Sequence, residues 1–264
     1  MPPEILFWLS LISKMAITAA FVLAATITAE RAGPLVGGLV ATLPIAAGPV
    51  YVFLALDHDA AFIANSALIS FVTNPAIAVF ALTYALLAQR FGLSISLGVA
   101  FAIWIALASF LQSLQWTFTP ALLLSVVVFP VCLFIARPLR NAPVPRMRGY
   151  WYDKALRALS VALLVASVVA LSFRIGPAGT GVLAVFPIVL SSIIVILHRR
   201  VGGKAAAAVL ANTVLGLVGF GCALATLHLT AVPLGPAIAL PIALAVSVGW
   251  SLAVLLARKR GIPV

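Results

Sequence analysis

The amino-acid sequence predicts an all-α fold, a polytopic bundle of about nine transmembrane helices. Three observations lead to this prediction. The 264 residues are 64% hydrophobic and only 8% charged, with a mean hydropathy of +1.26, whereas soluble domains carry roughly 25% charged residues. Apolar runs long enough to cross a bilayer follow one another along the chain. Finally, the stretch Arg31–Ile45 recurs at Arg174–Ile188, which indicates an internal repeat.

The apolar runs reach the roughly 17–25 residues that a helix needs to cross the hydrocarbon core. They are continuously apolar rather than alternating, which predicts helices and not barrel strands. The count of nine depends on the fifth run, which is uncharged and long enough to span. The runs cover approximately 5–29, 34–56, 60–88, 92–114, 118–136, 155–173, 177–197, 204–227 and 234–257.

The basic residues lie between these runs and set the topology. If all nine runs span, every Lys and Arg except Lys14 and Arg174 falls on one side of the membrane. The positive-inside rule assigns that side to the cytoplasm, so we expect a periplasmic N-terminus and a cytoplasmic C-terminus. The same rule accounts for the net charge of +11, and we therefore expect no nucleic-acid binding.

An odd number of spans gives the repeat an inverted topology. Residues 1–115 form the first four-helix unit and 151–264 form the second, while 116–150 contribute a linker helix and a basic cytoplasmic loop. The offset between equivalent residues is 143 in the repeated motif and 147 after a four-residue insertion in the 198–204 loop. Inverted repeats of this kind are a common plan of secondary transporters.

The segment Gly37–Pro44, Gly-Gly-Leu-Val-Ala-Thr-Leu-Pro, follows one helix and precedes two others. In this arrangement it resembles the GlpM-like small bacterial membrane proteins, which are four-helix chains of one unit. The whole chain resembles two such units fused in tandem, although the second copy has Thr180 where the first has Gly37. The resemblance implies this architecture and a bacterial inner membrane, and it carries no settled activity.

Two prolines mark the centre of a predicted solute path. Pro44 and Pro187 each fall inside an apolar run, where a helical proline frees the carbonyl four residues earlier. In lipid that carbonyl needs another partner, such as Thr42, a neighbouring helix or water. The prolines are either kinks tolerated for packing or symmetry-related hinges that flank a solute site.

Three asparagines lie within or near the third and eighth apolar runs. Asn65 and Asn212 occupy equivalent positions of the two units, and Asn74 lies before a proline. Amides at such positions either form hydrogen bonds between helices or line a polar cavity. With Pro44, Pro187 and Thr42 they make up the candidate substrate path.

Basic side chains offer two further candidate sites. Arg31 and Arg174 each precede a helix N-terminus, where they either bind an anion together with the backbone amides or snorkel to the interface. Lys14 falls inside the first run and is either an intramembrane charge or a snorkelling side chain. The basic 137–157 loop sets the topology, and it also suits contact with anionic lipid headgroups.

The sequence lacks the groups of acid, base or metal-binding residues that an enzyme would need. The five acidic residues all lie at segment ends or in loops, so paired-carboxylate catalysis is not expected. The two cysteines and three histidines have no metal-ligand spacing. Asp57-His58-Asp59 is expected to be a solvated turn, with a cation site at the outer face as the alternative. We expect no catalytic residue, metal or cofactor.

These observations together predict a multi-pass inner-membrane protein that acts as a secondary transporter or permease. Its solute would be small and neutral, weakly anionic or lipid-like, because the scarcity of buried charge argues against strong proton or sodium coupling. The kinked helices 34–56 and 177–197 would form its centre. The alternative is a non-transporting accessory membrane protein that stabilises a partner complex. Neither the solute nor the oligomeric state can be inferred from the sequence.

Overall fold

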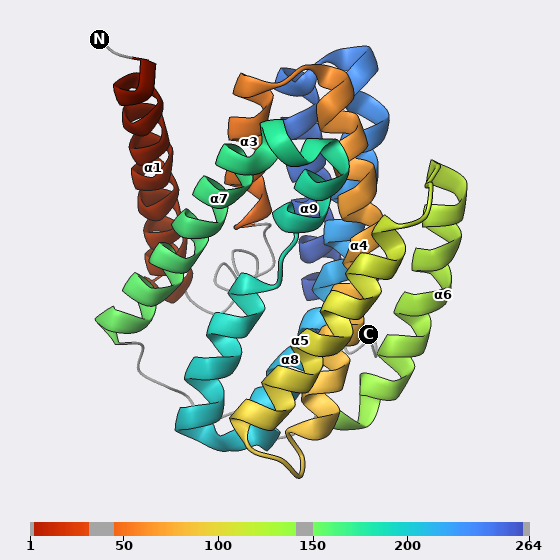
Figure 1. Ribbon diagram of the computed structural model, residues 1–264. Coiled ribbons are helices and arrows are strands. Elements are labelled where there is room, and N and C mark those ends of the chain that lie inside the picture. The colour runs from red at the N-terminus through yellow and green to blue at the C-terminus, as the bar shows by residue number, and fades with distance from the viewer. Residues whose placement is uncertain (1–2, 32–44, 141–149, 261–264) are drawn as a thin grey trace.

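The computed structural model describes residues 3–31, 45–140 and 150–260, and the regular structure in these ranges is entirely helical. The predicted all-α membrane bundle is therefore confirmed. In the order of the chain and with the labels of Figure 1, the helices are α1 (Pro3–Arg31), α3 (Ala47–Asp57), α4 (Ala60–Leu87), α5 (Leu93–Gln112), α6 (Phe118–Ala136), the short 3-10 helix η1 (Arg137–Leu139), α7 (Trp151–Ala184), α8 (Ile188–Leu234) and α9 (Pro236–Lys259).

Six helical stretches among the described residues are long and apolar enough to cross a membrane, where the sequence predicts nine. One of the six stretches, Trp151–Leu234, contains three of the predicted runs, 155–173, 177–197 and 204–227. They are joined because helical backbone continues on both sides of the bends described below. Helix α3 has 11 residues, too few to span alone. The part of the predicted run 34–56 that precedes residue 45 lies outside the described residues.

Helix α4 occupies the centre of the bundle. In an 18-residue apolar stretch of α4, 83% is buried inside the protein. The corresponding stretches of α1, α5, α6 and α9 are only 17–22% buried. α4 packs against α5, α6, α7 and α8, and Figure 1 shows α1 and α6 at opposite outer sides of it. The outer helices therefore direct apolar side chains toward lipid, as Phe134 of α6 does with 76% of its surface exposed.

Two glycines bend the long helices α7 and α8. Gly176 has φ 64° and ψ −175°, and Gly202 has φ 81° and ψ 170°. Side chains with a Cβ rarely adopt these angles, whereas glycine does so without steric cost. Pro177 directly follows the first bend, so it lies in the first turn of the helical segment after it, where its missing N–H costs no hydrogen bond.

Pro187 does not lie inside a helix, contrary to the sequence-based expectation. Helix α7 ends at Ala184 and α8 begins at Ile188, so Pro187 stands between two helices instead of kinking one. The proline ring disfavours helical backbone at the preceding residue, and Pro187 itself has a non-helical ψ of 44°. The equivalent Pro44 lies outside the described residues.

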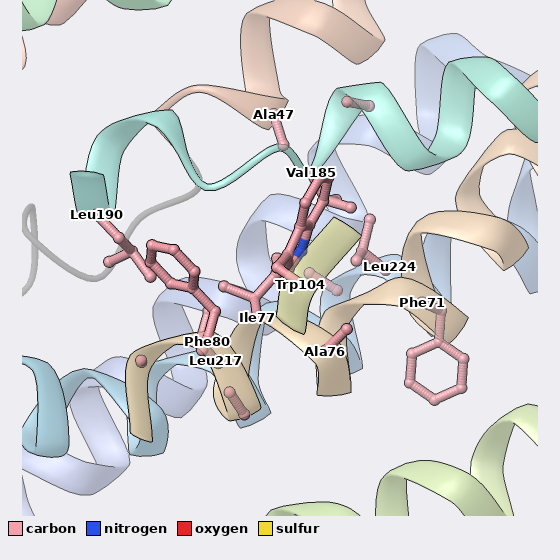
Figure 2. Close-up of a cluster of buried hydrophobic side chains, with 14 of the residues drawn as sticks. Ala47, Phe71, Ala76, Ile77, Phe80, Trp104, Val185, Leu190, Leu217 and Leu224 are labelled. Carbon is pink, nitrogen blue, oxygen red and sulfur yellow. The ribbon is translucent and has the colours of Figure 1, made fainter. Parts of the chain in front are cut away.

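The core gathers where these interrupted helices meet α4 and α5. Figure 2 shows Trp104 of α5 beside Val185 and Ile77, with Ala47 at the start of α3 close above them. All four residues are at least 95% buried. Phe186 packs against the Trp104 ring with 5.1 Å between ring centroids. The interruption at 185–187 is therefore enclosed by protein and not by lipid.

Gly181 of α7 allows the closest approach to α4 in this region. A Cβ at Gly181 would lie 2.5 Å from the Ser66 carbonyl oxygen and 2.8 Å from the Ile69 Cβ. We expect Gly181→Ala to lower the free energy of unfolding by roughly 1–3 kcal/mol, the usual cost of overpacking. Thermal unfolding of the purified protein in detergent would measure the effect.

Gly98 of α5 provides a matched control, because a Cβ there meets no atom within 4 Å. Gly98→Ala should leave the melting temperature unchanged or raise it slightly, since alanine is the better helix former. Equal melting temperatures for the two variants would contradict the tight α4–α7 contact.

Candidate functional site

A cavity of about 460 Å³ lies where the chain interrupts its helices. Ile45 and Ala46, which immediately precede α3, line one part of it, and Val185, Phe186 and Pro187 between α7 and α8 line another. Ile45 and Pro187 belong to the two copies of the repeated motif. The ends of both copies therefore border the same cavity.

The backbone at residues 185–187 is held by local hydrogen bonds. The Phe186 N–H donates to the Leu183 carbonyl at 3.1 Å, and the Ile188 N–H donates to the Phe186 carbonyl at 2.7 Å. The Ser191 hydroxyl and backbone N–H both donate to the Pro187 carbonyl, at 2.6 and 2.9 Å. Non-helical backbone at membrane depth is tolerated only where protein buries it or where it lines a cavity, and this segment meets both conditions.

Helices α8 and α9 supply the remaining walls. Thr213 and Trp250 line the cavity, and the Trp250 indole N–H donates to the Leu215 carbonyl at 3.0 Å. This bond fixes the ring between the two helices. Trp250 also packs closely over Gly219 of α8, where no larger residue would fit. The wall formed by α8 and α9 is therefore mainly apolar and rigidly held.

One end of the cavity is polar and basic. Asn212 of α8 accepts a hydrogen bond from the Arg258 guanidinium at 3.1 Å, and both residues line the cavity. The Asn212 amide donates to the Ala208 carbonyl at 2.9 Å and to the Arg140 carbonyl at 3.3 Å. Burial and the neighbouring charges of Arg258 and Arg137 lower the pKa of the Arg140 side chain. Arg140 therefore lies near two other guanidinium groups, of which Arg258 lines the cavity.

A stripe of polar residues runs along α4. Ser66, Ser70 and Asn74 follow one another at four-residue spacing, so they lie on one face of the helix, and all three are fully buried. The Ser70 hydroxyl donates to the Gly181 carbonyl at 2.6 Å, and the Asn74 amide donates to the Leu217 carbonyl at 2.8 Å. Asn74 thus joins α4 to α8 and does not line the cavity.

The structure separates the predicted substrate-path residues. Pro187 and Asn212 line the cavity, whereas Asn65 is exposed near the start of α4. Thr42 and Pro44 lie outside the described residues. Sequence reasoning missed Trp250 and Arg258, which only the packing of α9 against α8 brings to the cavity.

The predicted anion contacts and the lipid loop are described only in part. Arg174 is exposed near the bend of α7, while the Arg31 side chain lies outside the description. In the 137–157 region the Tyr150, Trp151 and Tyr152 rings are exposed, and residues 141–149 lie outside the described ranges. Arg200 stacks over the Tyr150 ring at 4.6 Å from its centroid.

A second polar cluster joins α1, α3 and α7. The Lys14 ammonium group lies 2.5 Å from a carboxylate oxygen of Asp57, and their side chains are only 12% and 22% exposed. Both residues line a smaller cavity of about 280 Å³. In the predicted solvated turn Asp57-His58-Asp59, Asp59 is exposed, whereas Asp57 is partly buried and forms an ion pair with Lys14. Residues far apart in the sequence form this pair, so no local pattern reveals it.

His58 completes the second cluster. Its Nε2 lies 2.7 Å from the Ser172 hydroxyl oxygen, and its ring stacks on Phe62 with 3.7 Å between centroids. Burial lowers the pKa of His58, the charges of Asp57 and Asp59 raise it, and Lys14 lowers it, with a net downward shift. The lowered pKa favours the neutral imidazole, which suits its position against aromatic rings.

Comparison with protein-family models, with curated proteins and with solved structures gives no match for this chain. The resemblance to GlpM-like proteins thus stays a prediction from the sequence.

The Lys14–Asp57 pair should couple α1 to α3 energetically. We expect Lys14→Met or Asp57→Asn alone to lower the free energy of unfolding by on the order of 1–3 kcal/mol, because each leaves a partly buried group without its partner. The Lys14→Met/Asp57→Asn double variant should recover part of this loss. Chemical unfolding of the four proteins in a double-mutant cycle would measure the coupling, and additive losses would exclude it.

Proposed function

We propose that this protein is a secondary transporter or permease of the inner membrane and that the 460 Å³ cavity is its solute site. One observation carries the proposal. The cavity is lined by the ends of both copies of the repeated motif, Ile45 before α3 and the non-helical segment Val185–Pro187 between α7 and α8, and α4 and α5 pack around this region of the bundle. Many secondary transporters bind their solute between discontinuous helices of two repeats.

The bends in α7 and α8 support the nine crossings that this proposal requires. Breaks at Gly176 and Gly202 would divide Trp151–Leu234 into three crossings, 151–175, 177–201 and 203–234. The middle crossing would itself be discontinuous at Pro187. In the first unit, the crossing that ends in α3 would be its counterpart. With α1, α4, α5, α6 and α9 the total would be nine.

The packing of helices supports a twofold relation between the units. In the proposed alignment α1 corresponds to the first part of α7, α4 to the last part of α8, and α5 to α9. The helices α1 and α7 pack together, as do α4 and α8, and α4 contacts α5 as α8 contacts α9. At the offset of 147, Asn74 corresponds to Gly221, and a Cβ on Gly221 would lie 2.9 Å from the Asn74 amide nitrogen. Equivalent residues meet in this way near a symmetry axis.

Transport would then proceed by movement of one unit against the other about this crossing of α4 and α8. The interruption at Val185–Pro187 would act as a hinge, because few backbone hydrogen bonds would have to break there. The cytoplasmic side would be the one that holds Arg137, Arg140 and Arg258. In this arrangement the cavity faces the cytoplasm at its basic end, and movement would open it to the periplasm.

Cysteine labelling tests alternating access without knowledge of the solute. Thr213→Cys would be introduced into a Cys132→Ser/Cys222→Ser background and treated with a membrane-impermeant maleimide from each side of oriented vesicles. A transporter exposes this position to both sides in turn, so labelling from both sides is expected.

Gln115→Cys and Lys259→Cys serve as controls for sidedness, because both positions are exposed at opposite ends of the proposed topology. The first should react only from the periplasmic side and the second only from the cytoplasmic side. Labelling of Thr213→Cys from one side only, with the controls behaving as expected, would favour the accessory-protein alternative.

A further inference from the structure

The large cavity combines two chemically different ends. Phe186, Phe220 and Trp250 contribute aromatic and apolar wall, while Arg258 and Asn212 form the polar end and are joined by a hydrogen bond of 3.1 Å. Small-molecule sites typically have volumes of about 300–1,000 Å³ with a few polar groups that orient the ligand. The volume of about 460 Å³ falls within this range. A ligand that fits both ends must be amphipathic.

The charge at the polar end is positive. Arg258 lines the cavity, and the backbone carbonyl of Arg140 accepts a hydrogen bond from Asn212 at the same end. Among the described residues, no Asp or Glu side chain lines the cavity. A guanidinium group in a mainly apolar wall favours a ligand that brings a carboxylate to it. The polar end therefore favours an anionic group.

The N-terminus of α8 adds to this preference. Val189 and Leu190, in its first turn, line the same cavity. The first amide groups of a helix have no intrahelical acceptor and carry a partial positive charge. Arg258 and the α8 N-terminus thus give the cavity a positive potential from two directions, while its aromatic wall disfavours a small, strongly hydrated ion.

We propose that the cavity binds an amphipathic organic monoanion, such as a medium-chain or aromatic carboxylate, with its acid group at Arg258 and Asn212 and its apolar body against Phe186, Phe220 and Trp250. The inference rests on the proposed function for its role as transported solute. Binding itself does not depend on transport and can be measured separately.

Trp250 provides a reporter inside the cavity. We would titrate the purified protein in detergent with 11-bromoundecanoate and with 6-bromo-2-naphthoate, and follow the quenching of tryptophan fluorescence by bromine. Saturable quenching is expected with at least one of the acids and should be weaker in Trp250→Phe, which retains Trp104 behind Phe186 and the tryptophans outside the cavity. Tighter binding of the long-chain acid would indicate that the ligand comes from the membrane. Tighter binding of the naphthoate would indicate that it comes from the aqueous phase.

The matched neutral ligand tests the role of charge in the unmodified protein. We expect 11-bromoundecanol to bind at least about tenfold more weakly than the corresponding acid, because a charge-assisted hydrogen bond is worth roughly 1.5–3 kcal/mol. Arg258→Gln should weaken acid binding by a similar factor. Lys259→Gln makes the same change of charge at the next residue, which does not line the cavity, and should bind the acid as the unmodified protein does.

Three results would overturn the inference: equal binding of acid and alcohol, equal effects of Arg258→Gln and Lys259→Gln, or quenching that is as strong in Trp250→Phe as in the unmodified protein. The first comparison needs no variant, so misfolding of Arg258→Gln would not prevent the test. Acid binding with Thr213→Cys labelled from one side only would retain this inference and reject transport. Labelling from both sides without acid binding would retain transport and reject this inference.

Discussion

A polypeptide in lipid must satisfy its backbone hydrogen bonds within the protein, and the rest of this structure depends on that constraint. The chain leaves the helical conformation between α7 and α8 at Val185–Pro187, where the proline has no N–H to donate. Such a segment is stable only if other helices surround it. Helix α4 and the Trp104 side chain of α5 supply this enclosure, with Phe186 packed against the indole ring. The central position of α4 and the location of the main cavity follow from the same requirement.

Charge is distributed under a related constraint. The Lys14 and Asp57 side chains are mostly buried, and each has the other as an ion-pair partner, because an isolated ion in lipid is costly. At the basic end of the large cavity, by contrast, Arg258 binds the neutral side chain of Asn212. One cluster is thus internally neutralised and acts as a link between helices. At the other, the Arg258 guanidinium lines a wall that is otherwise mainly aromatic and apolar, which is the reason for our proposal of an anionic ligand.

The sequence predicted the cavity only in part, and the individual residues show why. Pro187 was identified because a proline in an apolar run has a local consequence for the backbone, and it does line the cavity, although it separates two helices instead of kinking one. The predicted repeat makes Asn65 and Asn212 equivalent, yet Asn65 is exposed and Asn212 lines the cavity. A repeat specifies which residues correspond, but the face that each presents depends on its neighbours. Trp250 and Asp57 had no local signal, since their partners lie on other helices.

The sequence by itself determined that this protein is a helical membrane protein, because 64% hydrophobic residues in long uninterrupted runs are compatible with no other solvent than lipid. It also identified the recurring Gly-Pro and Pro positions, whose effect on the backbone is local. Only the tertiary structure decided which of these positions meet, which helix is enclosed, and which polar groups become partners. Hydrophobic periodicity cannot specify those contacts, because in lipid a helix face can be apolar whether it meets lipid or another helix. The choice of neighbours then depends on close packing, as at Gly181 against Ser66, and on hydrogen bonds between distant residues, as from Asn74 to Leu217.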